Sequence, residues 1–257
     1  MAGRNRMSFM ISRIVGNTLA TRIVFCGAVL ALCRLAVAYV DPPAEKPQPA
    51  ALVADMDEEE LKPGTVACAN LVYGSGKTSV CYSPQFLADV GKQTNIVTQS
   101  RFSPVKLESS RLYQYPFAVW TGEGGFALTP EQRTNLRNYL TNGGFIVASA
   151  GCSSPEWIDS CRREISATFP EIRLNRLDFT HPLFHTVHHI TRLECRHEKN
   201  TMLEGLEIDG RIVLVFSSDG LNDTANAGSK SCCCCGGNEI RNARLINVNL
   251  LAYALTH

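Results

Sequence analysis

The stretch YPFAVWTGEGGFALTPEQRTNLRNYLTNGGFIVASAGC, residues 115–152, decides the fold class of this chain. Residues 117–120 and 145–150 are short apolar runs of the kind found in parallel strands that are buried on both faces. The segment between them has the pattern of one helix. A strand–helix–strand crossover of this kind makes the two strands parallel and the connection right-handed. The stretch therefore predicts an α/β fold.

The helix inside this stretch has clear start and stop signals. Thr129 is a good N-cap, Pro130 suits the first helical position, and Gln132 completes a capping box. A glycine pair at residues 143–144 ends the helix. Its expected buried stripe is Leu136, Tyr139 and Leu140.

The rest of the chain continues to alternate strands and helices. Further strands are expected at residues 66–73, 95–98, 172–177 and 211–218. Further helices are expected from residue 83 or 84 to 90, from 154–155 to just before Pro170, and within 238–257. We therefore predict one three-layer α/β domain over residues 64–257, with a mostly parallel sheet and helices on both faces.

Composition excludes some classes of partner. The chain has 257 residues, of which 45% are hydrophobic and 19% charged, and these are ordinary values for a globular protein. Its formal net charge is +1, so charge alone indicates neither nucleic acid nor acidic lipid as a partner.

The N-terminal region has the order of a secretory signal. Several arginines precede an apolar run at residues 23–32, and Ala36-Val37-Ala38 follows as a small-x-small cleavage site. Arg34 interrupts the run before it reaches the roughly 18 to 20 apolar residues that a membrane span needs. We expect residues 1–38 to be a signal peptide or membrane anchor and residues 39–63 to be a disordered linker rich in Pro, Ala and acidic residues. The protein would then be exported, as a periplasmic or membrane-attached part of the cell envelope.

Cysteine usage is unusual. The chain has 11 cysteines, four of them consecutive at residues 232–235. Cleavage after Ala38 would remove Cys26 and Cys33 and leave an odd number, so a fully paired monomer is excluded in that case. The cysteine run has two interpretations: a compact loop that is held by disulfides or by packing, and a metal site. We favour the loop because zinc ligands normally come in separated pairs.

Several motifs occur in order between residues 66 and 257. They are the stretch 115–150, Phe169-Pro170, His181-Pro182-Leu183-Phe184, Leu203-Glu204-Gly205, Asp209-Gly210-Arg211 and Ser217-Ser218-Asp219. Together they resemble the domain of unknown function 4159 family. The resemblance implies a glutamine-amidotransferase-like, flavodoxin-type fold, bacterial envelope proteins and no established activity. The chain departs from the family pattern at Glu123, where a histidine is expected, and it lacks an acidic residue expected near Ser149.

The loops after the two central strands should meet at the carboxyl edge of the sheet, where open α/β sheets bind ligands. Glycines there allow a ligand to approach the backbone, and hydroxyls beside a helix N-terminus can bind it. The alternative is that the glycines only turn the chain. The predicted ligand-binding residues are Gly122, Glu123, Gly124, Gly125, Ser153, Ser154 and, in the loop after the strand at 211–218, Asp219.

The same edge predicts a candidate nucleophile, Cys152, placed after a strand and before a helix N-terminus that would lower the pKa of its thiol. A histidine among residues 181–189, first of all His181, would act as its base, and Glu123 or Asp219 would orient that base. Against this hypothesis, a strained nucleophile turn favours glycine on both sides, whereas the sequence here is Ala-Gly-Cys-Ser-Ser.

Two other kinds of site carry less weight. Gly76-Lys77-Thr78 is similar to the end of a phosphate-binding loop, but Leu71 stands where that motif needs glycine. His181, His185 and His189 have metal-ligand spacing, but Pro182 disfavours a helix that would align them. We therefore expect no metal and no cofactor. We predict a non-catalytic module that binds a small ligand or an envelope protein, with a Cys152 hydrolase as the alternative.

Overall fold

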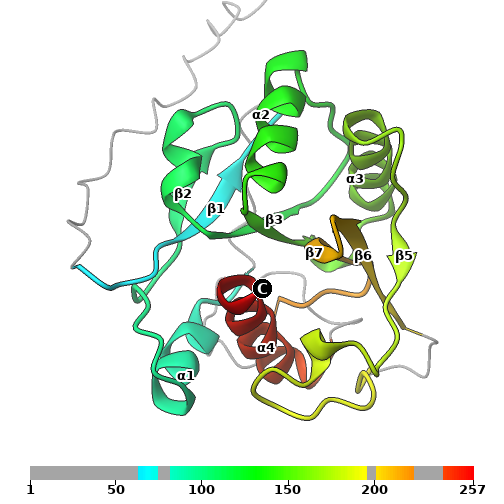
Figure 1. The fold of residues 1–257 in the computed structure, drawn as a ribbon. Helices are drawn as coiled ribbons and strands as arrows, with labels where there is room; N and C mark the ends of the chain where they lie inside the picture. The colour runs from blue at the N-terminus through cyan, green and yellow to red at the C-terminus, as the bar shows by residue number, and fades with distance from the viewer. Residues whose placement is uncertain (1–62, 75–81, 196–200, 223–239) are drawn as a thin grey trace, which may run out of the picture. The chain divides into compact units, whose positions relative to one another are not determined.

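The computed structural model describes residues 63–74, 82–195, 201–222 and 240–257 (Figure 1). The predictions for residues 1–62, for Gly76-Lys77-Thr78 and for the cysteine run at 232–235 lie outside these ranges. Within the described ranges, no helix is both long and apolar enough to cross a membrane.

One sheet forms the middle layer, with the strand order β2-β1-β3-β4-β7-β6-β5. The first five strands in this order run parallel to their neighbours, whereas β6 and β5 are antiparallel. The strand bounds are β1 Cys68–Val72, β2 Ser103–Lys106, β3 Phe117–Gly122, β4 Phe145–Ala150, β5 Asn175–Arg176, β6 Leu203–Ile208 and β7 Arg211–Ser217.

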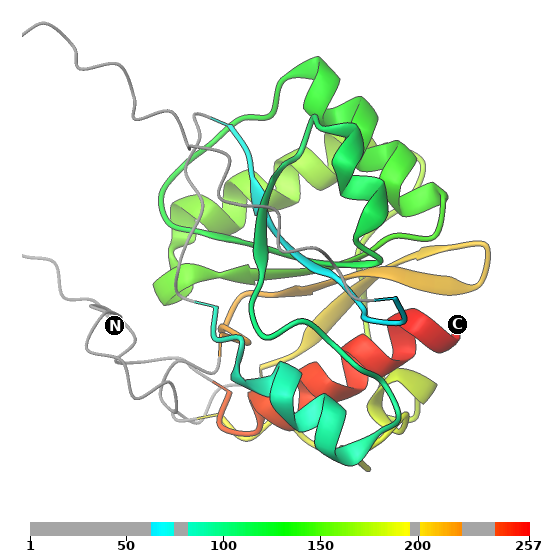
Figure 2. The same cartoon turned by 90° about the vertical axis from the view of Figure 1, so that its left-hand side faces the viewer.

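Helices cover both faces of the sheet, as Figures 1 and 2 show. Helices α2, Pro130–Thr141, and α3, Pro155–Thr168, pack together on one face, while α1, Gln85–Gln93, and α4, Ala243–Thr256, pack together on the other. Three 3-10 turns complete the described elements: η1 Ser110–Gln114, η2 Gly151–Ser153 and η3 Pro182–Phe184. The predicted three-layer α/β architecture is confirmed.

Residues 115–152, the stretch that decides the fold class, fold as their sequence indicates. Strands β3 and β4 pair in parallel from Phe117 opposite Phe145 onward, and every residue of both strands is buried. Thr129 caps α2, and Gln132 returns the second bond of the capping box. Trp120 and Trp157 are fully buried and belong to the core.

The edges of the sheet differ from expectation. The strand predicted at residues 95–98 makes only a single bridge, between Val66 and Thr98, and the true second strand is β2. The predicted strand at 172–177 shrinks to β5, which has two residues. Strands at the edge of a sheet are half exposed, so hydrophobic pattern identifies them poorly.

The antiparallel hairpin of β6 and β7 was not predicted. Its turn is Asp209-Gly210, and both residues have positive φ, 51° and 77°. A two-residue turn of this kind matches the twist of an antiparallel pair, and Asp-Gly is a preferred sequence for it. The signal was therefore present, but the flanking strand LEGLEI carries too much polarity to stand out.

Candidate functional site

The loops that leave β3 and β4 lie against each other at the carboxyl edge of the sheet. The Gly124 N–H donates to Ser154 Oγ at 3.1 Å. A Cβ on Gly151 would lie 2.8 Å from the Gly122 carbonyl oxygen and 3.1 Å from the Glu123 side chain, so only glycine fits there. The turn after β7 joins them, because a Cβ on Gly220 would lie 3.7 Å from the Ala150 carbonyl oxygen.

The turn between β4 and α3 is tight and unusual. Ser153 has a φ of 50°, a left-handed conformation that is uncommon for a residue other than glycine. Ser154 caps α3 by accepting from the Trp157 N–H, and its hydroxyl donates to Glu156 at 3.0 Å. The Glu156 backbone N–H and this hydroxyl lower the pKa of the Glu156 carboxyl. The side chain of Cys152 lies outside the described part of the structure.

The predicted glycines have different roles. A Cβ on Gly122 would lie 2.1 Å from the Tyr73 hydroxyl and 2.7 Å from Trp157 Nε1. The packing of these two side chains therefore requires glycine at this position. Gly124 has a φ of 73° with open space around it, and Gly125 is exposed. We call the surface formed by Glu123, Gly124, Gly125, Ser153, Ser154 and Asp219 the rim; Glu123 and Gly125 are exposed and the others half-buried.

Beneath the rim lies a row of buried hydroxyl groups that the sequence analysis missed. Thr121, Ser149 and Ser217 pair in register on β3, β4 and β7. Each comes two residues after a valine that packs toward α1 and α4, so all three side chains face that layer. All three residues are fully buried. We call these three residues the hydroxyl row.

Among the residues that the structure describes, only the central member of the hydroxyl row finds hydrogen-bond partners for its side chain. Ser149 Oγ accepts from the Leu221 N–H at 2.8 Å and donates to Asn222 Oδ1 at 2.9 Å. Thr121 Oγ1 and Ser217 Oγ are buried and have no hydrogen-bond partner among the residues described. A buried hydroxyl in this state calls for an explanation such as a bound water or ligand.

A polar network from α4 supports the row. Asn247, itself fully buried, donates to the Leu221 carbonyl at 2.8 Å and accepts from the Tyr82 hydroxyl at 2.6 Å. The network fixes the loop after β7 against the closing helix. The end of β7, and Asp219 beyond it, are therefore held in place by hydrogen bonds rather than by apolar contact alone.

His181 lies at the opposite edge of the sheet from Cys152. Its ring is 5.7 Å from that of Tyr253, whose hydroxyl accepts from the Ile212 N–H near the amino end of β7. Ser217 is the fifth residue after Ile212 on β7, which places it roughly 16 Å farther along the sheet. The structure therefore does not bring His181 to the Cys152 turn.

The segment that carries the other described histidines packs against α4. The backbone N–H groups of Val187 and His188 both donate to Asn249 Oδ1, at 3.1 Å and 2.7 Å, in the middle of α4. The rings of His185 and His189 contact each other, with centroids 4.5 Å apart and planes tilted by 30°. Over the described ranges, no group of three or more His, Cys, Asp or Glu side chains is arranged to hold a metal ion.

Two cysteines in the described ranges have thiols that burial makes unreactive. Burial raises the pKa of the Cys68 thiol to about 12 and raises that of Cys161 well above its ordinary value. A thiol that stays protonated at neutral pH is a poor nucleophile. Neither residue is a candidate for catalysis.

A family model, Domain of unknown function (DUF4159), matches residues 67–255 of the chain. The chain belongs to the DUF4159 family. The matched region contains the rim, the hydroxyl row and the whole sheet of this DUF4159 domain. No curated protein matches the chain.

The hydroxyl row had a faint signal in the sequence. Strands β3, β4 and β7 end in Trp-Thr-Gly, Ala-Ser-Ala and Val-Phe-Ser, so each apolar run has a hydroxyl near its carboxyl end. The row becomes visible only once the register of the three strands is known, because a shift of one residue would turn any member to the other face.

Proposed function

We propose that this DUF4159 protein is a non-catalytic binding module whose ligand lies at the carboxyl edge of β3, β4 and β7. The observation that carries the proposal is the hydroxyl row beneath the rim, with two buried hydroxyls that lack partners among the described residues. Leaving a buried polar group unsatisfied costs about 1–3 kcal/mol, so such groups are retained where something else supplies the bond.

The chemistry of the rim favours a ligand rich in hydroxyl or amino groups. Glu123 and Asp219 supply carboxylate oxygens, which accept hydrogen bonds, and Ser153 supplies a hydroxyl that both donates and accepts. A sugar presents many hydroxyl groups, and an amino sugar adds a positive charge that the carboxylates attract. We therefore propose a small sugar-like ligand, with an envelope protein that presents the same groups as the alternative partner.

The strand order supports a finer description of the fold. Counted along the chain, the five parallel strands have the spatial order 2-1-3-4-5, the order of flavodoxin-type sheets. In such sheets ligands bind outside the carboxyl ends of the strands. We propose the flavodoxin-type fold on this ground, while kinship with glutamine amidotransferases rests on analogy of fold.

Export to the cell envelope belongs to the same proposal. Its support is the positively charged, then apolar, then small-x-small order of residues 1–38. N-terminal sequencing of the mature protein is expected to begin at Tyr39. An intact Met1 on the cytosolic protein would contradict export.

A cysteine hydrolase is the second candidate function. The left-handed backbone of Ser153 favours it, because strained residues cluster at active sites. A cysteine nucleophile also needs a base within hydrogen-bond reach, and His181, the first candidate for that base, lies at the other end of the sheet. Rapid, Cys152-dependent labelling by a thiol probe near neutral pH would support the hydrolase, whereas slow labelling supports binding alone.

Titration calorimetry with glucosamine and glucose tests the proposed function. We expect saturable binding of glucosamine that is tighter than that of glucose, and we expect Cys152→Ala to bind as the wild type does. The double variant Thr121→Val/Ser217→Ala removes the two hydroxyls of the row that have no partner among the described residues, and it should weaken binding at least about tenfold.

Thr141→Val serves as the matched control, because it removes an exposed hydroxyl at the end of α2, on the opposite face of the sheet. Equal affinity for the double variant and the wild type would contradict a role for the hydroxyl row. No saturable binding of either sugar would reject the proposed ligand class.

A further inference from the structure

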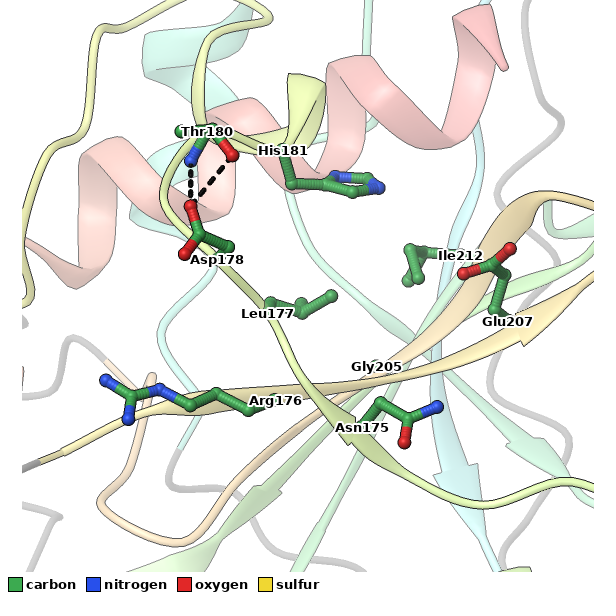
Figure 3. A pocket seen from close by; sticks show the side chains of 9 residues that line it. All are labelled: Asn175, Arg176, Leu177, Asp178, Thr180, His181, Gly205, Glu207 and Ile212. Carbon is green, nitrogen blue, oxygen red and sulfur yellow. Dashed lines mark hydrogen bonds between the residues drawn. The ribbon is translucent and has the colours of Figure 1, made fainter.

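A hollow that shares no residue with the rim lies at the β6–β7 hairpin (Figure 3). Its volume is about 200 Å³. It opens on the face of the sheet that also carries α4, beside the loop that leads into η3. Its lining residues are Asn175, Arg176, Leu177, Asp178, Thr180, His181, Gly205, Glu207 and Ile212.

The floor of the hollow is apolar and depends on a glycine. Leu177 and Ile212 are 7% and 2% exposed. A Cβ on Gly205 would lie 2.7 Å from Leu177 Cδ2 and 2.9 Å from Ile212 Cδ1, so the missing side chain lets these two residues close together. The result is a small aliphatic surface on the sheet, of the kind that a short apolar side chain covers.

His181 presents a hydrogen-bond donor to this hollow. Its Nδ1 accepts from the Leu183 N–H at 3.1 Å, so the neutral ring carries its proton on Nε2. Burial lowers the pKa of His181, although the Glu207 carboxylate opposes that effect, and the ring is neutral at neutral pH. Figure 3 shows the ring extending toward the end of the hollow where Glu207 lies.

Glu207 presents an acceptor at the same end. Among the described residues, neither Glu207 nor Asn175 has a hydrogen bond or ion pair through its side chain. Asp178 is different, because its carboxylate already accepts from the Thr180 N–H and hydroxyl, both at 2.8 Å. Glu207 is thus the lining carboxylate whose oxygens accept no hydrogen bond from the described residues.

We propose that this hollow binds a free aliphatic amino acid of the size of leucine. Its ammonium group would pair with Glu207, its carboxylate would accept from His181 Nε2–H, and its side chain would lie over Leu177 and Ile212. An amino acid carries its amine and its carboxylate on one carbon, so a neighbouring acceptor and donor above an apolar floor match it. Nothing in this proposal depends on the rim binding a ligand.

Titration of the full chain with L-leucine, followed by calorimetry, tests the proposal. We expect a Kd on the order of 1 mM, because the ligand has few atoms and two charged groups. Glu207→Gln should weaken binding at least about tenfold. His181→Asn should do the same, since asparagine can still cap the Leu183 N–H but does not reach into the hollow.

The matched control is Glu131→Gln, which removes an exposed carboxylate from α2 and should leave leucine affinity unchanged. Leucinamide, which lacks the carboxylate, should bind at least about tenfold more weakly than leucine. Absence of saturable binding, equal affinity of Glu207→Gln and wild type, or equal affinity for leucinamide would each overturn the proposal. Glucosamine binding by Glu207→Gln separates this result from the rim, because that variant leaves the rim intact.

Discussion

Ser149 and Ser217 are neighbours in register, yet their hydroxyls have opposite energetic roles. Ser149→Ala would leave the Leu221 N–H and Asn222 Oδ1 without their partner, so we expect it to lower the free energy of unfolding by about 1–3 kcal/mol. Ser217→Ala removes a buried hydroxyl that has no described partner, so we expect a change below about 0.5 kcal/mol or a gain in stability.

Urea unfolding of the two variants without added ligand measures this difference. Equal destabilisation by both substitutions would show that the Ser217 hydroxyl has a structural partner, and it would remove the observation that carries the proposed function.

The buried thiols give a second prediction at the scale of single residues. Burial raises the pKa values of Cys68 and Cys161, so both thiols stay protonated at pH 8 and should react slowly with iodoacetamide in the folded protein. In urea both should react at the rate of an ordinary thiol. Mass spectrometry of the labelled peptides measures both rates, and fast labelling of either cysteine in the native state would show that its strand or helix opens readily.

At this scale the sequence placed the rim residues at the edge of the sheet that they occupy, but it wrongly grouped His181 with Cys152. Gly124, Ser154 and their neighbours follow buried strands, so their place at the carboxyl edge follows from topology alone. His181 lies in an irregular segment, where no periodicity indicates which edge of the sheet the chain approaches. Packing of η3 against α4 decides its place, and this contact is not visible in local sequence.

Helix α2 depends on Gln132 more than on its N-cap residue. Thr129→Ala removes one capping bond and should cost about 1 kcal/mol. Gln132→Ala should cost more, because Gln132 Oε1 accepts from the Thr129 and Gly74 N–H groups and its Nε2 donates to Glu108. These bonds connect α2 to the ends of β1 and β2.

Thermal and urea unfolding of the two variants test this order. Thr134→Ala, at an exposed position of the same helix, is the control and should change stability by less than about 0.5 kcal/mol. A larger cost for Thr129→Ala than for Gln132→Ala would contradict the connecting role.

Predictability also varied by element. The central strands and α2 carry strong apolar runs and caps, so local and tertiary preferences agree there. β2 has the sequence Ser-Pro-Val-Lys with only Val105 buried, and its place in the sheet depends on pairing with β1. Strand β6 likewise forms by pairing with β7, and β5 by pairing with β6. Local sequence patterns do not predict these pairings.

At the scale of the whole molecule, the two ends of one sheet present different chemistry. The carboxyl edge combines the rim with buried hydroxyls, while the β6–β7 end combines an aliphatic floor with Glu207 and His181. Because the two sites share no residue, substitutions in one should leave ligand binding at the other unchanged.

The carboxyl edge of β3, β4 and β7 is the proposed binding site. Backbone ¹H–¹⁵N spectra of the labelled protein, recorded during a titration with glucosamine, test it most directly. We expect saturable shifts at the amides of Gly124, Ser154 and Asp219, with Gly205 and Glu207 unmoved. Shifts confined to the β6–β7 end, or rim amides that stay unmoved while glucosamine binds, would contradict it.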